Sequence, residues 1–295
     1  MESFKNKSKN THTNHNLNKE NHMQIVSFPE IGLTLKLHKI AITIGKFSIH
    51  WYAILIVLSF MLALFFFYKN NGKFEIKFND ILDLMLYLIP ISIISARIYY
   101  CIFKADYYLK NPLQIFNIQS GGLAIYGGII GGAITCYIFC KKRKLNFLSL
   151  FDYITPYLAL GQAIGRWGNF INVEAYGTET SLPWRMRILE NGIYKEVHPT
   201  FLYESIADFV IFIILVCLNS NKAKQKYKFT GKTTYIYLIL YSLARFFIEG
   251  LRTDSLMLYN IKISQILSLA IFVVCSILLM KKTQLNRKID RNTEK

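Results

Sequence analysis

One short string holds the residues of this chain that are best suited to chemistry: GRWGNFINVEAYG, at positions 165–177. Arg166 carries a rigid fork of N–H donors that matches the oxygens of a phosphate or a carboxylate. The string also supplies groups that could position an ester or let a backbone approach closely: Asn169, Asn172, Glu174 and Gly177. An isolated arginine or asparagine here could equally cap a helix or snorkel, but the combination favours a binding site for an anion.

A second group of polar residues follows a helical spacing in an apolar segment nearer the C-terminus. Tyr241, Arg245, Glu249 and Arg252 stand at i, i+4, i+8 and i+11, so a helix would place them on one face. Further polar residues stand near the ends of other apolar segments: His50, Tyr52, Arg97, Tyr126 and Glu204. Charged groups within membrane segments are costly and usually mark function. We therefore expect one polar cavity whose arginines require an anion, and phosphate fits them best.

Each of these pieces also has a structural reading. His50 and Tyr52, with the tryptophan between them, could form an interfacial aromatic belt. Arg97 could be a structural arginine, and the two glutamates near the arginines could simply neutralise them. The glycines at 121–132 could serve close helix packing.

The elements that must position these residues are apolar segments. The chain is 53% hydrophobic and 18% charged, and seven runs approach the length that crosses a bilayer: 48–68, 81–103, 121–140, 148–165, 201–218, 234–250 and 263–280. Glycine or polar residues weaken the runs at 121–140 and 148–165. We predict an all-α integral membrane protein, a bundle of about seven transmembrane helices, with a long functional loop at about 166–200.

Composition divides the chain into four expected regions. Residues 1–22 are rich in Asn, Lys and His and are expected to be a disordered extension. Residues 23–47 are expected to form short strands or an interfacial lead-in. The transmembrane bundle would then occupy 48–281, and 282–295 would be a basic cytoplasmic tail.

The basic residues indicate membrane topology and not a nucleic-acid partner. The formal net charge is +17, but Lys and Arg are spread over several loops instead of one stripe. They gather after the first, third, fifth and seventh apolar runs, so the positive-inside rule places the N-terminus and the loop 166–200 outside and the C-terminus in the cytoplasm. The five cysteines lie in or beside apolar runs without CxxC spacing, and we expect no disulfide framework, metal site or cofactor.

The string at 165–177 resembles the signature of the prolipoprotein diacylglyceryl transferases, and four other blocks are similar to blocks of that family: IHWYA at 49–53, GGLAIYGG at 121–128, HPTFLYE at 198–204 and YSLARFFIEGLR at 241–252. The resemblance implies a seven-helix bundle in the bacterial cytoplasmic membrane, with its site near the outer face. It implies transfer of a diacylglyceryl group from phosphatidylglycerol to the lipobox cysteine of prelipoprotein signal peptides. The products would be a thioether and glycerol phosphate.

The same resemblance implies roles for individual residues. Arg166 and Arg245 match essential arginines, and Tyr52 matches a functional tyrosine. The signature and the segment near the C-terminus supply the other matches: Asn169, Glu174, Gly177, Tyr241, Glu249 and Arg252. Some members have histidine before the paired glycines, where this chain has Tyr126, so a mechanism that uses that histidine as general base does not transfer to this chain.

A mechanism follows from these residues without a histidine base. Arg166 and Arg245 would hold the phosphate and its leaving oxygen, and Glu249 and Glu174 would orient them. Tyr126 or Tyr52 would hydrogen-bond near the thiol. Asn172 and His50 would complete the phosphatidylglycerol site. A free cysteine has a pKa of about 8.5, and an electropositive cavity would raise its thiolate fraction.

Two other function classes share part of this pattern. A transporter or flippase for an anionic lipid would also use an arginine cavity, but it needs access to both faces and we find no matching charged residues towards the cytoplasm. A structural membrane protein would leave the cavity unexplained.

Overall fold

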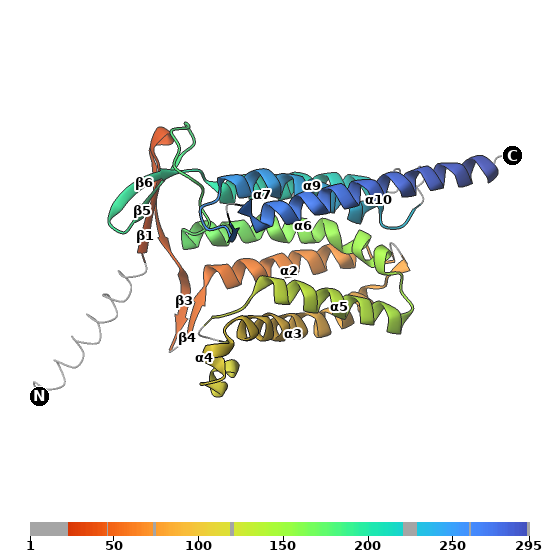
Figure 1. Ribbon diagram of the computed structural model, residues 1–295, viewed down its shortest axis with the longest axis horizontal. Helices are drawn as coiled ribbons and strands as arrows, with labels where there is room; N and C mark the ends of the chain where they lie inside the picture. The colour runs from red at the N-terminus through yellow and green to blue at the C-terminus, as the bar shows by residue number, and fades with distance from the viewer. Residues whose placement is uncertain are drawn as a thin grey trace, which may run out of the picture. The chain divides into compact units, whose positions relative to one another are not determined.

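The computed structural model describes residues 23–45, 47–72, 75–118, 121–220, 229–259 and 261–293, and most of them are helical (Figure 1). The expected extension at 1–22 lies outside the described residues. Seven long helices fall in the described ranges, and each overlaps one of the apolar runs: α2 (Trp51–Lys69), α3 (Phe78–Phe103), α5 (Ile125–Arg143), α6 (Phe147–Asn172), α7 (Thr200–Leu218), α9 (Lys232–Leu251) and α10 (Ile263–Thr293). Short helical turns in the same ranges are η1 (Pro29–Ile31), α4 (Ala105–Tyr108) and η3 (Pro112–Phe116).

Five of the long helices in the described residues are long and apolar enough to cross a membrane: α2, α3, α7, α9 and α10 over residues 263–288. Many of their large apolar side chains are exposed, among them Met61, Leu86 and Ile206, as expected for surfaces that face lipid instead of water. The other two helices, α5 and α6, coincide with the runs that the sequence marked as weak. Four glycines dilute α5, and α6 contains Pro156 and the buried Asp152.

The chain is not all-α as predicted, because short strands flank the helices. They are β1 (Met23–Phe28), β2 (Leu33–His38), β3 (Ile40–Ile44), β4 (Phe47–His50), β5 (Met186–Glu190), β6 (Ile193–Val197), β7 (Met257–Leu258) and β8 (Ile261–Lys262). Four of them make an antiparallel sheet of order β2-β1-β5-β6, and β3-β4 and β7-β8 are separate pairs. Of the two structures expected for residues 23–47, the strands are confirmed.

Part of the long segment at 166–200 forms a hairpin and is not simply a loop. Strands β5 and β6 flank Asn191 and Gly192, whose φ angles of 51° and 81° are those of a type I′ turn position. In β5 Met186 and Ile188 are buried and the residue between them is not, and in β6 Val197 is buried. The sequence emphasised the charges and turn residues here, and the hairpin was not predicted.

The apolar face of the four-stranded sheet packs on the ends of two helices. Val26, Met186 and Val197 are almost fully buried, and they contact Phe170 of α6 and Phe201 of α7. The rings of Phe170 and Phe201 stack with centroids 4.5 Å apart. Burial of such side chains is worth about 1.5–3 kcal/mol each. The sheet therefore fixes the end of α6 beside the beginning of α7.

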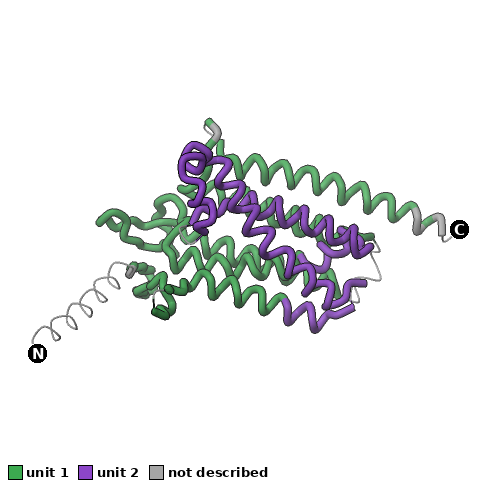
Figure 2. Tube along the Cα trace, turned by 90° about the horizontal axis from the view of Figure 1, so that it is seen from below, with its two compact units in different colours: residues 1–63, 155–295 green, residues 64–154 purple. Residues whose placement is uncertain are grey.

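By its internal contacts the chain divides into two units, residues 1–63 with 155–295, and residues 64–154 (Figure 2). In the second unit, α3 and α5 pack through small residues. A Cβ on Gly127 would lie 2.4 Å from Cβ of Tyr99, and one on Gly131 would lie 2.2 Å from Oγ of Ser95. The alternative reading of these glycines, close helix packing, is confirmed.

Candidate functional site

A single carboxylate, Glu204 of α7, gathers three arginines within the first unit. Nη2 of Arg166, on α6, lies 2.5 Å from Oε2 of Glu204. Nη1 of Arg245, on α9, donates to Oε1 at 2.7 Å, and Nη1 of Arg252, just beyond α9, donates to the same oxygen at 3.2 Å. The Glu204 side chain is only 5% exposed, so these contacts form in a largely dry environment.

Two further carboxylates complete this arginine–carboxylate network. Nη2 of Arg245 lies 2.5 Å from Oε2 of Glu249, an ion pair by distance without the alignment of a hydrogen bond. Arg252 donates through Nε and Nη2 to the two oxygens of Asp254 at 2.9 and 2.8 Å. Burial works against the charge of Asp254, but these hydrogen bonds from Arg252 hold the pKa of its carboxyl below the usual range. Arg245, Glu249 and Arg252 thus share one face, as their spacing predicted.

The network is balanced in charge within itself. Three guanidiniums meet three carboxylates, and the three arginine side chains are 12–20% exposed. Buried charges are stable only when they are paired. The structural reading, in which glutamates neutralise the arginines, is confirmed. Their charge alone therefore does not require an external anion, and phosphate binding stays a prediction. One donor is left over: the buried Nε of Arg166 has no hydrogen-bond partner among the described residues.

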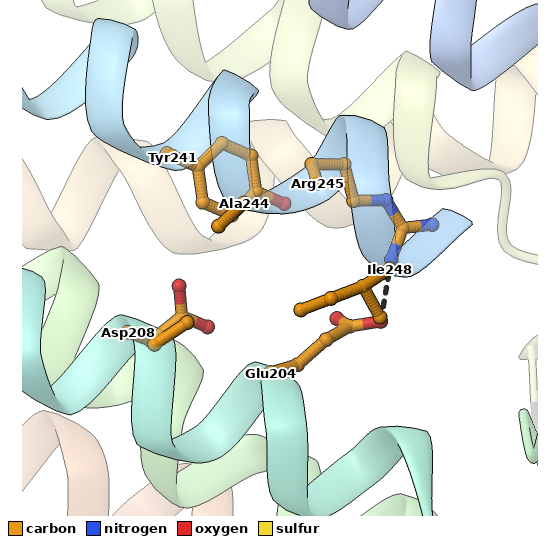
Figure 3. Close-up of a pocket in the computed structure, with 7 residues that line it drawn as sticks. Glu204, Asp208, Tyr241, Ala244, Arg245 and Ile248 are labelled. Carbon is orange, nitrogen blue, oxygen red and sulfur yellow. Dashed lines mark hydrogen bonds and ion pairs between the residues drawn. The ribbon is translucent and has the colours of Figure 1, made fainter. Parts of the chain in front are cut away.

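A pocket of about 10 Å³, roughly the space of one water molecule, lies beside the network between α7 and α9. Figure 3 shows Glu204 and Asp208 extending from one helix towards Tyr241 and Arg245 of the other. Asp208 is 2% exposed, and its Oδ2 has no hydrogen-bond partner in the described part of the chain. Tyr241 thus joins the pocket with Arg245, as its spacing predicted.

The end of the string at 165–177 is tied to itself. The side-chain amides of Asn169 and Asn172 donate to Oε1 of Glu174 at 2.8 and 3.2 Å, and the backbone N–H of Glu174 donates to the carbonyl of Asn169 at 3.0 Å. Val173 and Ala175 adopt positive φ angles of 49° and 59°, an uncommon conformation for such residues. Glu174 therefore holds this turn, and the structure gives it contacts to the asparagines instead of to the arginines that it was predicted to orient.

Gly177 brings the string against the end of α9. Its N–H donates to the carbonyl of His198 at 3.0 Å, and it forms an isolated β-bridge with Arg252. A Cβ at this position would lie 2.7 Å from Cβ of His198 and 3.2 Å from the carbonyl oxygen of Leu251. A glycine is required because both neighbours approach so closely. Burial lowers the pKa of the adjacent His198, so its ring favours the neutral form.

Tyr52, His50 and Tyr126 occupy different surroundings. The ring of Tyr52 packs on Gly168 of α6, where an added Cβ would lie 2.3 Å from Cδ2 of that ring. His50 is exposed at the end of β4, opposite Ile40. Tyr126 is half-buried in the first turn of α5, in the second unit. Tyr52 is thus packed against the helix that carries Arg166, whereas Tyr126 belongs to the other unit.

Arg97 is a structural residue of the second unit. It is 4% exposed, and its guanidinium donates to five backbone carbonyls of the segment that follows α3, those of Gln114, Ile115, Asn117, Gly121 and Gly122, at 2.6–3.0 Å. An arginine has five N–H donors, so all are used within the protein. The structural reading of Arg97 is confirmed.

Glu204 was expected in the polar cavity only as one of several polar residues or as a counter-charge, and its central place in the network was not predicted. Glu204 and Asp208 stand at i and i+4 in a strongly apolar helix, and this pair of acids within one span was the available signal. Asp254 follows Arg252 by two residues and gave no comparable signal. Its pairing with Arg252 depends on the turn of the backbone between the two residues, which only the structure shows.

Comparison with known proteins agrees with this arrangement. The family described as prolipoprotein diacylglyceryl transferase matches residues 39–281. A phosphatidylglycerol–prolipoprotein diacylglyceryl transferase of Finegoldia magna is 50% identical over 243 residues, which are 82% of this chain and 95% of that protein. Proteins of the same name from Clostridioides difficile and Bacillus cereus are 47% and 40% identical and cover 78% and 90% of this chain, and 90% and 99% of their own lengths. The match includes the arginine–carboxylate network and most of both units, and the chain belongs to the prolipoprotein diacylglyceryl transferase family.

Proposed function

We propose that this protein transfers the diacylglyceryl group of phosphatidylglycerol to the thiol of the lipobox cysteine of prelipoproteins, the first step of lipoprotein maturation. Membership of the family over residues 39–281 is the observation that carries this proposal. The arginine–carboxylate network supports it, because a phosphodiester substrate needs guanidinium donors held in fixed positions.

The protein works as a multi-pass enzyme of the bacterial cytoplasmic membrane. Besides the five helices that could span a membrane, we propose that α5 and α6 also cross it, since each contains an apolar run of about the required length. The lysines and arginines that follow alternate runs favour an N-terminus outside and a C-terminus in the cytoplasm. The arginine–carboxylate network would then lie near the outer face.

Arg166 is the residue that would contact the substrate phosphate most directly. Its Nη2 pairs with Glu204, but its buried Nε has no hydrogen-bond partner within the described ranges. A phosphate oxygen that accepted from Nε would satisfy a buried donor that otherwise costs about 1–3 kcal/mol. Arg245 and Arg252 use their donors on carboxylates, so we propose that they hold Glu204 and Arg166 in place, and that Arg245 adds positive potential at the leaving oxygen.

In the reaction the thiolate sulfur bonds to the glyceryl carbon, and the bond between that carbon and the phosphate oxygen breaks. The electron pair stays on the phosphate oxygen, which leaves as glycerol phosphate. Either Tyr52 or Tyr126 is the proposed hydrogen-bonding group for the thiol. Asn169, Asn172 and Glu174 keep the turn that follows Arg166 in shape, and Gly177 admits the end of α9.

Mass spectrometry of a peptide substrate tests this function. Purified protein in detergent is mixed with phosphatidylglycerol and a peptide that carries a lipobox cysteine. The peptide should gain the mass of one diacylglyceryl group, and a matched peptide with serine in place of that cysteine should gain nothing. An unmodified cysteine peptide, with folded protein and an active relative alongside, would refute the proposal.

Arg166→Lys tests the phosphate contact in the same assay. Lysine keeps the charge but cannot contact Glu204 and a phosphate oxygen at once through a planar fork. We expect at least a tenfold loss of transfer, equivalent to about 1.4 kcal/mol in the barrier, while thermal unfolding shows a folded protein. Near-normal turnover would show that Arg166 is not the phosphate ligand.

A further inference from the structure

Lys262 contacts the arginine–carboxylate network from a part of the chain that the proposed mechanism does not use. Lys262 is the last residue of strand β8, which pairs with β7 in a short hairpin that follows α9. Its ammonium donates to the backbone carbonyls of Glu249, Gly250 and Arg252 at 2.8, 3.0 and 2.7 Å. An ammonium group has three N–H donors, so Lys262 spends all of them on the end of one helix.

These contacts provide partners for carbonyls at the C-terminus of α9. The last carbonyls of a helix have no partner within the helix. Here Lys262 takes those of Glu249 and Gly250, and the N–H of Thr178 donates to that of Leu251 at 2.8 Å. The lysine also places its positive charge at the negative end of the helix dipole, where a cation is stabilised.

The backbone of Arg252 is therefore held from two sides. On one side it forms the bridge with Gly177, and Oγ1 of Thr253 donates to the carbonyl of Tyr176 at 3.2 Å. On the other side its carbonyl accepts from Lys262. From this fixed backbone the guanidinium reaches Glu204, which also pairs with Arg166 and Arg245.

We propose that Lys262 is a positioning residue for diacylglyceryl transfer: it fixes the backbone of Arg252, and Arg252 fixes Glu204 for the arginine that contacts the phosphate. This inference rests on the proposed function and adds to it a residue outside the string at 165–177 and outside α9. Positioning errors of about 1 Å can cost roughly 10²-fold in rate, so loss of the three bonds should be visible in kcat.

Kinetics of two lysine variants test the proposal in the peptide assay. Lys262→Met keeps a chain of similar length without donors and should lower kcat about tenfold or more, with KM for phosphatidylglycerol changed less than twofold. Lys262→Arg, which can still donate to several carbonyls, should recover most of the loss. The matched control is Lys282→Met, because Lys282 lies near the other end of α9, where its ammonium makes a long hydrogen bond of 3.4 Å to the carbonyl of Thr230 and lies 5.4 Å from the centroid of the Tyr235 ring. We expect the kcat of Lys282→Met to lie within twofold of that of the unmodified protein.

A double-mutant cycle shows whether Lys262 acts through Arg252. In an Arg252→Ala background, Lys262→Met should have almost no further effect on kcat, since the group that it positions is gone. If Lys262→Met does not fold, Lys262→Gln, with two donors, takes its place and should give a smaller loss. An unmodified protein that fails to transfer would refute the proposed function. Transfer by the unmodified protein together with a normal kcat in folded Lys262→Met, or an undiminished effect in the Arg252→Ala background, would refute the role of Lys262 alone.

Discussion

Replacing Glu204 by glutamine tests the charge balance of the arginine–carboxylate network. Glutamine keeps the shape and one acceptor oxygen but removes the charge that three guanidiniums share. The network then carries one unpaired positive charge in a place where the Glu204 side chain is 5% exposed. Removing one partner of a buried ion pair costs about 3–5 kcal/mol. The arginines keep 12–20% exposure, so water screens part of this cost, and we expect about 3 kcal/mol.

Thermal unfolding in detergent measures this effect. At about 2–4 °C per kcal/mol, Glu204→Gln should lower the unfolding temperature by about 6–12 °C. The control is Glu30→Gln: Glu30 pairs with Arg185 at 2.7 Å, but its side chain is 51% exposed, and the loss of such a surface pair should leave the unfolding temperature unchanged. A Glu204→Gln protein as stable as the unmodified one would mean that the arginines need no internal counter-charge, and the argument for a balanced network would fail.

Two further predictions concern regions outside the network. Arg97→Lys should destabilise the backbone at residues 114–117 and 121–122, since a lysine can satisfy at most three of the five carbonyls. Two lost bonds at about 1.5 kcal/mol each give about 3 kcal/mol. Faster proteolysis after residue 114 would report the loss, and an unchanged cleavage rate would contradict it. For pH, the hydrogen bonds from Arg187, and then those from Arg185, lower the pKa of Glu196 against the effect of burial. Its contribution to stability is therefore present above pH 4.5 and lost as the pH falls through the lowered pKa. Protection of peptides over 186–197 against hydrogen exchange, relative to the intrinsic exchange rate at each pH, should therefore fall below pH 4.5, and Glu196→Gln should remove this fall. An equal fall in the variant would assign it to other groups.

Local sequence patterns predicted the elements better than their partners. Apolar length predicted the seven long helices of the described residues, because an apolar segment that could cross a membrane must satisfy its backbone internally and therefore continues for a fixed length. Helical spacing also placed Arg245, Glu249 and Arg252 on one face. In each case the information lies within one continuous segment, so no knowledge of tertiary contacts was needed.

Residues whose partners come from distant parts of the chain were not predictable in the same way. Glu204 is a hub only because α6 and α9 bring arginines to it, and the sequence could not tell a hub from a simple counter-charge. Arg97 is a charged residue within an apolar segment, as a site residue would be. A sequence does not distinguish a guanidinium that binds five carbonyls from one that binds a ligand. The four-stranded sheet was not predicted because its paired strands β1 and β5 are separated by more than a hundred residues.

The arrangement changes the meaning of the string at 165–177. Of its polar residues, Arg166 joins the network, whereas Asn169, Asn172 and Glu174 bind one another. Gly177 then provides the space that lets Arg252 dock. If these residues were separate substrate ligands, each substitution would weaken phosphatidylglycerol binding by itself. If most of them are a scaffold, substitutions at Asn169, Glu174 and Gly177 should instead act on kcat through Arg166 and Arg252, and should be non-additive with changes in those arginines. The contacts favour the scaffold, because the asparagine amides that could contact an ester are used to hold Glu174.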